Sequence, residues 1–388
     1  MRTPECVLIA DDFLPHLGGS RIYYHMVASR LAPRLAVVTR ARGGGREFDE
    51  EANYVIRRVA LRGGKAGGLT VIDEAANCAS LIRAAAEAFP SAQCFLAGEV
   101  NPSAFAAAIL AGWRAGAFGV VLHDEPLMGA GAVEATVRRR VLRRAEVIIT
   151  SSSFPERQAR EIVGEEVRIF PAPPGVDMAA FSPGPVDRGV LERYAVRAHE
   201  YLLCVGRLVK YKNVGAVVEA LAELSDAKIR LVVVGEGPER APLEGRASEL
   251  GVAGRVIFAG RLEKDELAQL YRGALAYVFP SQKCGGRQHE GIGMAALEAA
   301  ACACAVIAST ATSTGDFVEE GVTGTLFDAE ERGALVRAIR MLVEEPDFRK
   351  RTAAEAAKKV REKYTWENTA NAVGRALDEM CGKQARLP

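Results

Sequence analysis

The sequence predicts an α/β protein with two doubly wound parallel-sheet domains. Short apolar runs of strand length alternate with longer amphipathic segments of helix length, which is the pattern of βαβ units. A stretch rich in Pro and Gly at 170–189 interrupts this alternation, which then restarts. The chain has 388 residues and 49% hydrophobic content, enough for two or three domains with sizeable cores.

The first half contains seven candidate strands, each a short run of apolar and β-branched residues. They lie at 7–10, 35–39, 55–59, 94–97, 119–122, 147–150 and 168–170. Helical periodicity fills most of the intervals. It is clearest at 21–31, 71–88, 103–115 and 133–145.

The second half repeats the pattern after the linker. We expect strands at 201–205, 230–234, 256–258, 276–279, 305–308 and 325–327. Helices are expected at 214–224, 238–250 and 264–272, around Glu298, and at 330–344, 347–364 and 366–380. We therefore predict domains at 1–182 and 183–365, facing across a cleft of the kind in which open α/β sheets bind ligands.

The balance of charge excludes some classes of partner. Lys and Arg number 50 and Asp and Glu 49, so the formal net charge is +1 and gives no general attraction to nucleic acid. Eight scattered Cys without metal spacing indicate a reducing compartment. The apolar run at the N-terminus is too short for a signal peptide. We therefore expect a soluble, cytoplasmic protein that binds no nucleic acid and no metal.

The most informative stretch is 281–309. A polar, Gly-rich segment leads into an Ala-rich helix, with Glu290 and Glu298 eight residues apart and Gly291 and Gly293 between them. Amide groups at a helix start attract anions, phosphate above all. Glu298 lies among apolar residues, where a charge needs a partner. Either these acids are structural, or they belong to a ligand site.

Three further groups are expected at strand ends, where α/β proteins place ligands. Gly18 and Gly19 precede a helix, so their amides could face an anion. Arg207 and Lys212 follow the strand at 201–205 and suit a diphosphate. His123 ends the strand at 119–122.

Two other Gly motifs are weaker signals. V-G-E-G-P at 234–238 resembles the start of a dinucleotide fingerprint, but Arg240 occupies the third Gly position, which favours a tight turn. The triplet 43–45 lacks the Lys and Ser or Thr of a P-loop and predicts a flexible surface loop.

Taken together, the motifs resemble those of the retaining GT-B-fold glycosyltransferases of family 4 (glycosyl transferases group 1). The likeness covers nearly the whole chain. It rests on P-H-L-G-G at 15–19, His-Asp at 123–124, P-G-V-D at 174–177, G-R-L at 206–208 with Lys-Asn at 212–213, V-G-E-G-P at 234–238, E-G-I-G-M-A-A-L-E-A at 290–299 and G-V-T-G at 321–324. The resemblance implies two Rossmann-like domains, an acceptor domain and a donor domain. It also implies that a C-terminal helix, 366–388, crosses back to the first domain.

The resemblance also implies site residues. Arg207 and Lys212 would hold the donor diphosphate, Glu290 the transferred sugar and Glu298 the ribose, while His123 would support the charge at the anomeric carbon. The expected catalytic residues are therefore His123, Arg207, Lys212 and Glu290. The expected donor-binding residues are Gly18, Gly19, Gly235, Leu262, Gly291, Ile292, Gly293, Met294 and Glu298.

The implied activity is metal-independent transfer of a sugar from a nucleoside-diphosphate sugar to a hydroxyl acceptor such as a glycan, a lipid-linked sugar or a natural product. No cofactor is expected, and uridine diphosphate is favoured over guanosine diphosphate. The loop 281–289 is longer than the common form and carries Cys284, Gly285, Gly286 and Arg287. The alternatives are a non-catalytic nucleotide-sugar-binding module and a nucleotide-sugar epimerase.

A basic stretch, T-V-R-R-R-V-L-R-R at 136–144, raises the question of membrane association. Val137, Val141 and Leu142 would fall on one side of a helix, with five Arg over the rest. Such a helix can dock on anionic lipid, but charge runs are usually solvated faces. Membrane docking is therefore the less favoured interpretation, and the oligomeric state stays open.

Overall fold

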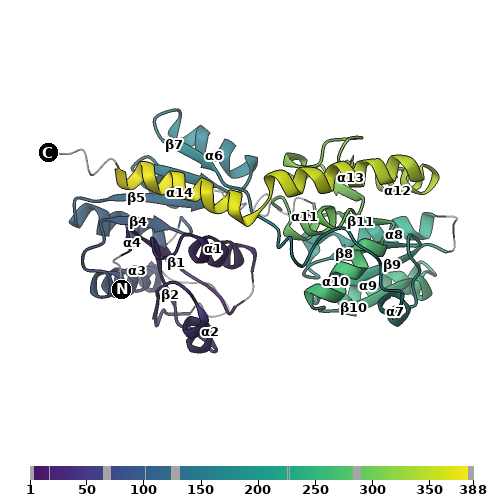
Figure 1. Ribbon diagram of the computed structural model, residues 1–388, viewed down its shortest axis with the longest axis horizontal. Coiled ribbons are helices and arrows are strands. Elements are labelled where there is room, and N and C mark those ends of the chain that lie inside the picture. Colours follow the sequence, from purple (N-terminus) through teal and green to yellow (C-terminus); the bar gives the residue numbers. More distant parts are fainter. Residues whose placement is uncertain are drawn as a thin grey trace. The chain divides into compact units, whose positions relative to one another are not determined.

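A computed structural model describes residues 4–16, 18–63, 71–100, 102–123, 132–224, 226, 228–282 and 290–382, with only the backbone described at 132–134. The chain forms two compact units (Figure 1). The first contains the chain up to Pro174 together with the helix that begins at Trp366, and the second is Gly175–Thr365. Each is described by itself.

The first unit is built on a seven-stranded sheet with strand order β3-β2-β1-β4-β5-β6-β7, in which every pairing is parallel. Its elements are β1 (Cys6–Ala10), α1 (Gly19–Arg30), β2 (Leu35–Arg40), α2 (Gly45–Glu51), β3 (Ile56–Val59), α3 (Val71–Ala88), β4 (Cys94–Ala97), α4 (Pro102–Trp113), β5 (Ala117–Leu122), α5 (Ala132–Leu142), β6 (Val147–Thr150), α6 (Ser153–Val163), β7 (Arg168–Pro171) and α14 (Trp366–Gly382). The central strands are buried along their whole length, as expected for parallel strands covered by helices on both faces.

The second unit is built on a six-stranded parallel sheet with strand order β10-β9-β8-β11-β12-β13. Its elements are α7 (Arg188–Arg193), β8 (Tyr201–Val205), η1 (Lys210–Lys212), α8 (Val214–Glu223), β9 (Arg230–Val234), α9 (Arg240–Glu249), η2 (Ala253–Arg255), β10 (Val256–Gly260), α10 (Lys264–Gly273), β11 (Ala276–Phe279), α11 (Met294–Ala301), β12 (Val306–Ser309), η3 (Ser313–Asp316), β13 (Thr325–Phe327), α12 (Ala334–Glu344) and α13 (Pro346–Lys363).

Alternate residues of the second sheet belong to two separate cores. Leu203, Val232 and Tyr277 pack with α10, α11 and α13, whereas Leu202 and Val233 pack with α8, α9 and α12. Because successive strand side chains point to opposite faces, helices cover both faces of this sheet. The predicted class, α/β with two parallel sheets, is confirmed.

The unit boundary differs from the predicted one at 182. Phe181 is only 2% exposed and packs on Tyr271 with a ring-centre distance of 5.9 Å. Val176 pairs with Thr365, so the chain after Gly175 is already part of the second unit. A Pro-rich composition signals a break in regular structure, but it does not reveal which side of the break holds the buried aromatic residue.

Three helices were not predicted from the sequence: α2, α6 and α7. The loop expected at 43–45 is a helix start instead, since Gly44 has a φ of 72° and α2 begins at Gly45. A Cβ on Gly45 would lie 2.6 Å from Arg58 Nε. Gly45 thus packs closely against the Arg58 side chain of β3.

Candidate functional site

A basic loop follows β8 at the carboxyl edge of the second sheet. Gly206 and Arg207 come directly after the strand, and η1 carries the chain through Lys212 to α8. Arg207 is exposed, and its Nη2 donates to Tyr211 Oη at 3.2 Å. Loops at this edge of a parallel sheet form the ligand sites of α/β proteins, so both predicted cations lie at an edge suited to binding.

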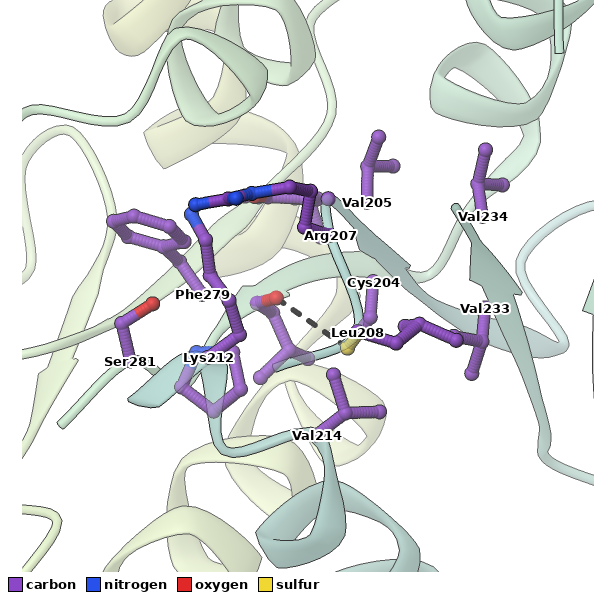
Figure 2. A pocket seen from close by; sticks show the side chains of 14 residues that line it. Cys204, Val205, Arg207, Leu208, Lys212, Val214, Val233, Val234, Phe279 and Ser281 are labelled. Carbon is purple, nitrogen blue, oxygen red and sulfur yellow. Dashed lines mark hydrogen bonds between the residues drawn. The ribbon is translucent and has the colours of Figure 1, made fainter. Parts of the chain in front are cut away.

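Lys212 forms an ion pair with Glu290. The two charged atoms, Nζ and Oε1, lie 2.7 Å apart, and the side chains are 16% and 17% exposed. The ammonium group also lies 5.3 Å from the centre of the Phe279 ring and 5.6 Å from that of Tyr211, distances at which a ring face attracts a cation. Figure 2 shows Lys212 with Arg207 and Phe279 around one pocket. The second unit thus brings together three of the four predicted catalytic residues.

Two glycines after β9 let a neighbouring loop lie against the basic loop. A Cβ on Gly235, whose φ is 130°, would lie 1.9 Å from Gly206 O, and one on Gly237 would lie 2.2 Å from Leu208 O. The two loops also share backbone hydrogen bonds. The glycines of the V-G-E-G-P motif therefore allow the close backbone packing that holds the loop carrying Arg207 in place.

The start of α11 is shaped by Gly293. This residue has a φ of 77°, and a Cβ there would lie 2.6 Å from the Phe279 ring. Gly291 and Ile292 are buried beside it, and their segment is held by hydrogen bonds from η3. The helix begins at Met294, and the first amides of a helix have no partner within it. This N-terminus is a suitable place for a phosphate or a sugar hydroxyl.

Glu298 is partly buried on α11, where it accepts a hydrogen bond from Tyr271 Oη at 3.2 Å. Burial raises the pKa of its carboxyl group to about 7, although the Tyr271 hydrogen bond and the charge of Lys264 act in the opposite direction. Lys264 itself pairs with Asp177 at 2.8 Å. Leu262, which precedes α10, is half-buried against the same core. The negative charge of the ionised Glu298 carboxylate is therefore only partly compensated by its neighbours.

We expect Glu298→Gln to stabilise the protein at high pH. A carboxyl group whose pKa is raised on folding contributes stability below its unfolded pKa, and that contribution is lost as the pH rises through the folded value. The ordinary pKa of 4.5 for Glu and the folded pKa of about 7 define the pH window of this loss. The free energy of unfolding of the variant should therefore equal that of the wild type near pH 4.5 and exceed it at pH 8 by about 2–3 kcal/mol.

Denaturant unfolding at pH 4.5 and pH 8 measures this difference. Glu355→Gln is the matched control, because Glu355 is exposed on α13 and should show no such pH dependence. A Glu298→Gln protein that is less stable than the wild type at pH 8 would contradict the assignment of Glu298 as a destabilised acid.

Gly18 and Gly19 lie at the start of α1 in the first unit. Gly18 is the N-cap with no side-chain hydrogen bond, and α1 has no acidic residue in its first turn. A Cβ on Gly19 would meet nothing within 4 Å, whereas one on Gly18 would lie 2.5 Å from Arg21 Nη1. The helix start is therefore open at Gly19 and flanked by an Arg.

His123 lies at the end of β5, enclosed by two tyrosines. Its ring centre is 5.1 Å from that of Tyr23 and 5.3 Å from that of Tyr24. Burial lowers the pKa of His123 to about 4, so the imidazole is neutral at pH 7. Its Nε2 lies 2.9 Å from Tyr24 Oη, while Tyr24 Oη donates to Gly98 O.

These contacts favour the tautomer of His123 that carries its proton on Nε2. A carbonyl oxygen can only accept, so the Tyr24 proton points to Gly98 and the proton shared with His123 belongs to Nε2. Nδ1 then carries the lone pair and can accept from a ligand hydroxyl. Tyr24 was not predicted from the sequence, although a Tyr pair one turn after Gly-Gly in a short helix was a usable signal.

Some predicted features lie outside the described residues. These are Asp124 and the loop positions Cys284, Gly285, Gly286 and Arg287. Within the described part of the chain, no group of three or more His, Cys, Asp or Glu side chains is arranged to hold a metal ion.

The basic stretch at 136–144 lies on α5 and the turn after it. Leu142 is fully buried and Val141 is 8% exposed in the core of the first unit, while Val137 is 39% exposed. The apolar side of this stretch is thus mostly occupied by the core and is not free to enter lipid. Across the described residues, none of the helices combines the length and apolar character needed to span a bilayer.

Comparisons with known proteins agree on one class. The protein-family model described as "Glycosyl transferases group 1" matches residues 196–359. The structure of Anabaena Alr3699/HepE in complex with UDP is similar in fold, with a TM-score of 0.81, 18% identity and coverage of 96% of this chain and 99% of that one. Sucrose-phosphate synthase from Thermosynechococcus elongatus gives a TM-score of 0.75 at 19% identity, over 98% of this chain and 100% of that one.

Two curated relatives are enzymes of this class. The GDP-mannose-dependent alpha-(1-6)-phosphatidylinositol monomannoside mannosyltransferase of Mycolicibacterium smegmatis is 29% identical over 349 residues, 88% of this chain and 89% of that protein. The D-inositol 3-phosphate glycosyltransferase of Acidothermus cellulolyticus is 31% identical over 254 residues, 61% of this chain and 55% of that protein. The fold and the comparisons define a glycosyltransferase with the GT-B fold. The match to the family model of the glycosyl transferases group 1 lies within the second unit, over residues 196–359.

Proposed function

We propose that this enzyme transfers a sugar from a nucleoside-diphosphate sugar to a hydroxyl acceptor, with retention of anomeric configuration and without a metal. The observation that carries the proposal is the Lys212–Glu290 pair beside Arg207. Two cations and a carboxylate in one partly buried site can serve a departing diphosphate and a sugar hydroxyl. Such preorganised charge lowers the barrier where charge develops in the transition state.

We propose that each part of the donor is bound by different residues. Arg207, Lys212 and the start of α11 bind the diphosphate, and Glu290 accepts from the transferred sugar once Lys212 turns to the phosphate. Glu298 accepts from the ribose hydroxyls, and Leu262 lies beside the base. In the first unit, Gly18 and Gly19 serve the diphosphate, and His123 Nδ1 accepts from a sugar hydroxyl.

For the chemical step we propose a front-face mechanism, in which the departing diphosphate takes the proton of the acceptor hydroxyl. A covalent route needs an enzyme nucleophile on the opposite face of the sugar. The neutral His123 ring suits polar contact better than bonding. Anomeric configuration in the product, read by NMR, tests this step, and an inverted product or a trapped glycosyl-enzyme would contradict it.

Which nucleoside the donor contains, uridine or guanosine, can be determined by experiment. The mannosyltransferase relative from Mycolicibacterium smegmatis is named for GDP-mannose, whereas the similar fold of HepE was solved with UDP. Sequence analysis favoured uridine, and the names of the relatives favour guanosine with mannose. We therefore propose GDP-mannose and UDP-glucose as the first two donors to test.

Release of nucleoside diphosphate, measured with and without acceptor and with and without EDTA, tests the function. A transferase releases it in an acceptor-dependent manner, and EDTA has no effect if no metal is needed. Binding without release would identify a non-catalytic module. Sugar isomerisation without an acceptor would identify an epimerase.

We expect Tyr24→Phe to lower kcat by about tenfold without unfolding the first unit, because the hydroxyl that selects the His123 tautomer is lost. Nitrogen NMR of the histidines should show the proton at His123 no longer confined to Nε2. Tyr54→Phe is the matched control, since Tyr54 Oη contacts His25 Nδ1 at 2.7 Å away from the proposed site. Equal kcat for both variants would refute the positioning role of Tyr24.

A further inference from the structure

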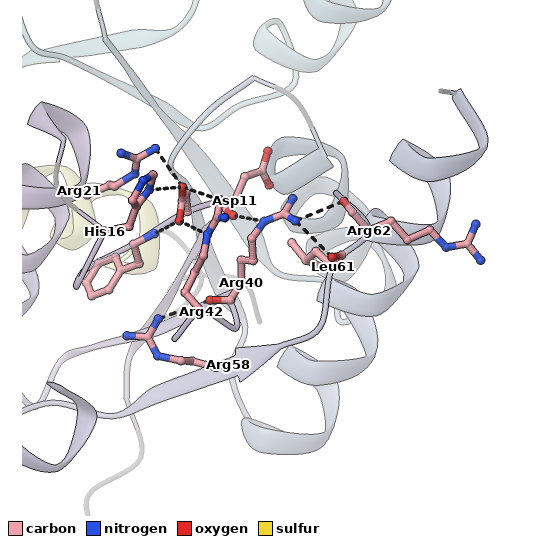
Figure 3. Close-up of polar contacts among 10 residues, drawn as sticks. Asp11, His16, Arg21, Arg40, Arg42, Arg58, Leu61 and Arg62 are labelled. Atoms are coloured by element: carbon pink, nitrogen blue, oxygen red, sulfur yellow. Dashed lines mark hydrogen bonds and ion pairs between the residues drawn. The ribbon is translucent and has the colours of Figure 1, made fainter. Parts of the chain in front are cut away.

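A buried polar side chain without a hydrogen-bond partner costs free energy, so each such group in a folded protein needs an explanation. The partly buried Arg40 shows the ordinary case, since it donates to the backbone oxygens of Asp11, Leu61 and Arg62 (Figure 3). A side chain that departs from this rule beside a ligand site is a candidate for a functional role.

Tyr277, on β11, is such a side chain. Its neighbours in the core of the second unit have partners: Tyr201 Oη donates to Leu270 O at 2.6 Å, and Tyr271 Oη donates to Glu298 Oε2 at 3.2 Å. Tyr277 is 0% exposed, yet its Oη has no hydrogen-bond partner among the residues that the structure describes. A phenylalanine would fill the same space without this cost, so packing alone does not explain the hydroxyl group.

The ring of Tyr277 contacts rings from two parts of the proposed donor site. It stacks on Phe279, with ring centres 6.2 Å apart and 24° between the planes, and Phe279 lies beside Lys212 (Figure 2). The ring centre of Tyr271 is 5.9 Å from that of Tyr277, and Tyr271 is the donor to Glu298. One aromatic cluster therefore joins the unpaired hydroxyl to the diphosphate and ribose parts of the site.

The hydroxyl of Tyr277 is a neutral donor within electrostatic range of both site acids. Burial raises the pKa of Tyr277 well above its ordinary range, and the neighbouring Cys204, Glu290 and Glu298 add to this rise. The phenol therefore keeps its proton and can donate it to one acceptor.

Glu298 can accept a second hydrogen bond from the protein. An ionised carboxylate has about four acceptor positions, of which Tyr271 takes one and two ribose hydroxyls would take two more. The carboxyl group of the free protein has a pKa of about 7, and hydroxyls that donate to it favour its ionised form. Ribose binding thus places a full negative charge beside an unpaired phenol.

We propose that Tyr277 is a positioning residue for Glu298, whose carboxylate accepts from the Tyr277 hydroxyl when the ribose of the donor is bound. This inference rests on the proposed function, in which Glu298 accepts from the ribose hydroxyls. The Tyr271 and Phe279 rings hold the phenol in place, so the carboxylate moves to it. A hydrogen bond to a charged group is stronger than a neutral one, and it fixes the carboxylate for the ribose.

Tyr277→Phe tests the proposal through stability and binding together. Because the hydroxyl is unpaired without donor, its removal should raise Tm by about 2–4 °C. Calorimetry with GDP and with UDP should show binding weakened by about tenfold. The 2′,3′-dideoxy forms of both diphosphates should bind equally to the variant and the wild type. With a sugar donor, the variant should raise KM with little change in kcat, since ribose contacts change little in the transition state.

Tyr201→Phe is the matched control, because it removes a buried hydroxyl that does have a partner. Tyr201 is 0% exposed on the neighbouring strand β8 and donates to Leu270 O. Its loss leaves that carbonyl unpaired, so the control should lower Tm. The affinities for GDP, UDP and their dideoxy forms should stay at the wild-type values.

The outcomes separate this inference from the proposed function. A lower Tm for Tyr277→Phe, an unchanged affinity for GDP and UDP, or an equal loss for the dideoxy forms would each overturn the role of Tyr277. A wild type that binds ribose and dideoxy forms equally would overturn the ribose contact of Glu298 and this inference with it. Ribose-dependent weakening by Tyr277→Phe in an enzyme that releases no nucleoside diphosphate from a sugar donor would support Tyr277 and overturn the proposed function.

Discussion

Lys212→Ala should lower kcat by about a hundredfold or more, because it removes a cation that is preorganised for the departing diphosphate. The ammonium group is held by Glu290 at 2.7 Å and by two aromatic rings. It therefore stays beside the pocket that Arg207 also lines, and has only to turn from Glu290 to the phosphate. Single-turnover release of nucleoside diphosphate measures the effect, and Lys210→Ala, an exposed Lys in the same turn η1, should leave the rate unchanged.

The same substitution also leaves Glu290 without its cation, which could itself disturb the site. The double variant Lys212→Met with Glu290→Gln separates the two causes, because it removes both charges together. A rate restored in the double variant would attribute the loss to the unpaired Glu290. A Lys212→Ala enzyme with normal turnover would refute the diphosphate assignment.

Gly235→Ala should destabilise the second unit by about 2–4 kcal/mol and abolish most activity. Its Cβ would lie 1.9 Å from the backbone oxygen of Gly206, and the φ of 130° is unfavourable for alanine. A backbone atom cannot rotate away as a side chain can, so the loop that carries Arg207 must move. Thermal unfolding and donor binding measure the two consequences.

Gly245→Ala is the matched control for this prediction. Gly245 lies within α9, and a Cβ there would meet nothing within 4 Å. Alanine is about 0.5–1 kcal/mol better than glycine in a helix interior, so this variant should be slightly more stable than the wild type. Equal stability of Gly235→Ala and Gly245→Ala would show that the loop tolerates the added methyl group.

The sequence was sufficient for the two parallel sheets, because each of their strands is a short apolar run. It also pointed to the polar residues of the second-unit site, since Arg207 follows β8, Lys212 ends η1, Glu290 precedes α11 and Glu298 lies within α11. Short helices such as α7 escaped detection because six residues, Arg188–Arg193, are too few for a periodic pattern.

The contacts that give these residues their properties could not be predicted. The Lys212–Glu290 pair joins segments far apart in sequence, and the pKa of Glu298 depends on how deeply α11 packs. The role of Gly235 requires knowing that Gly206 lies against it. Periodicity describes one segment at a time, whereas each of these properties belongs to two segments in contact.

The last helix, α14, gives the chain an unusual order of assembly. It packs on α1, β5, β6 and β7, and Trp366, Val373, Leu377 and Met380 are almost completely buried in the first unit. The second unit is continuous, whereas the first unit needs both the chain up to Pro174 and α14. The early segment therefore cannot complete its own core, because α14 comes after the whole of the second unit. A chain that ended at Thr365 would keep every element of the second unit and leave an apolar surface of the first unit uncovered.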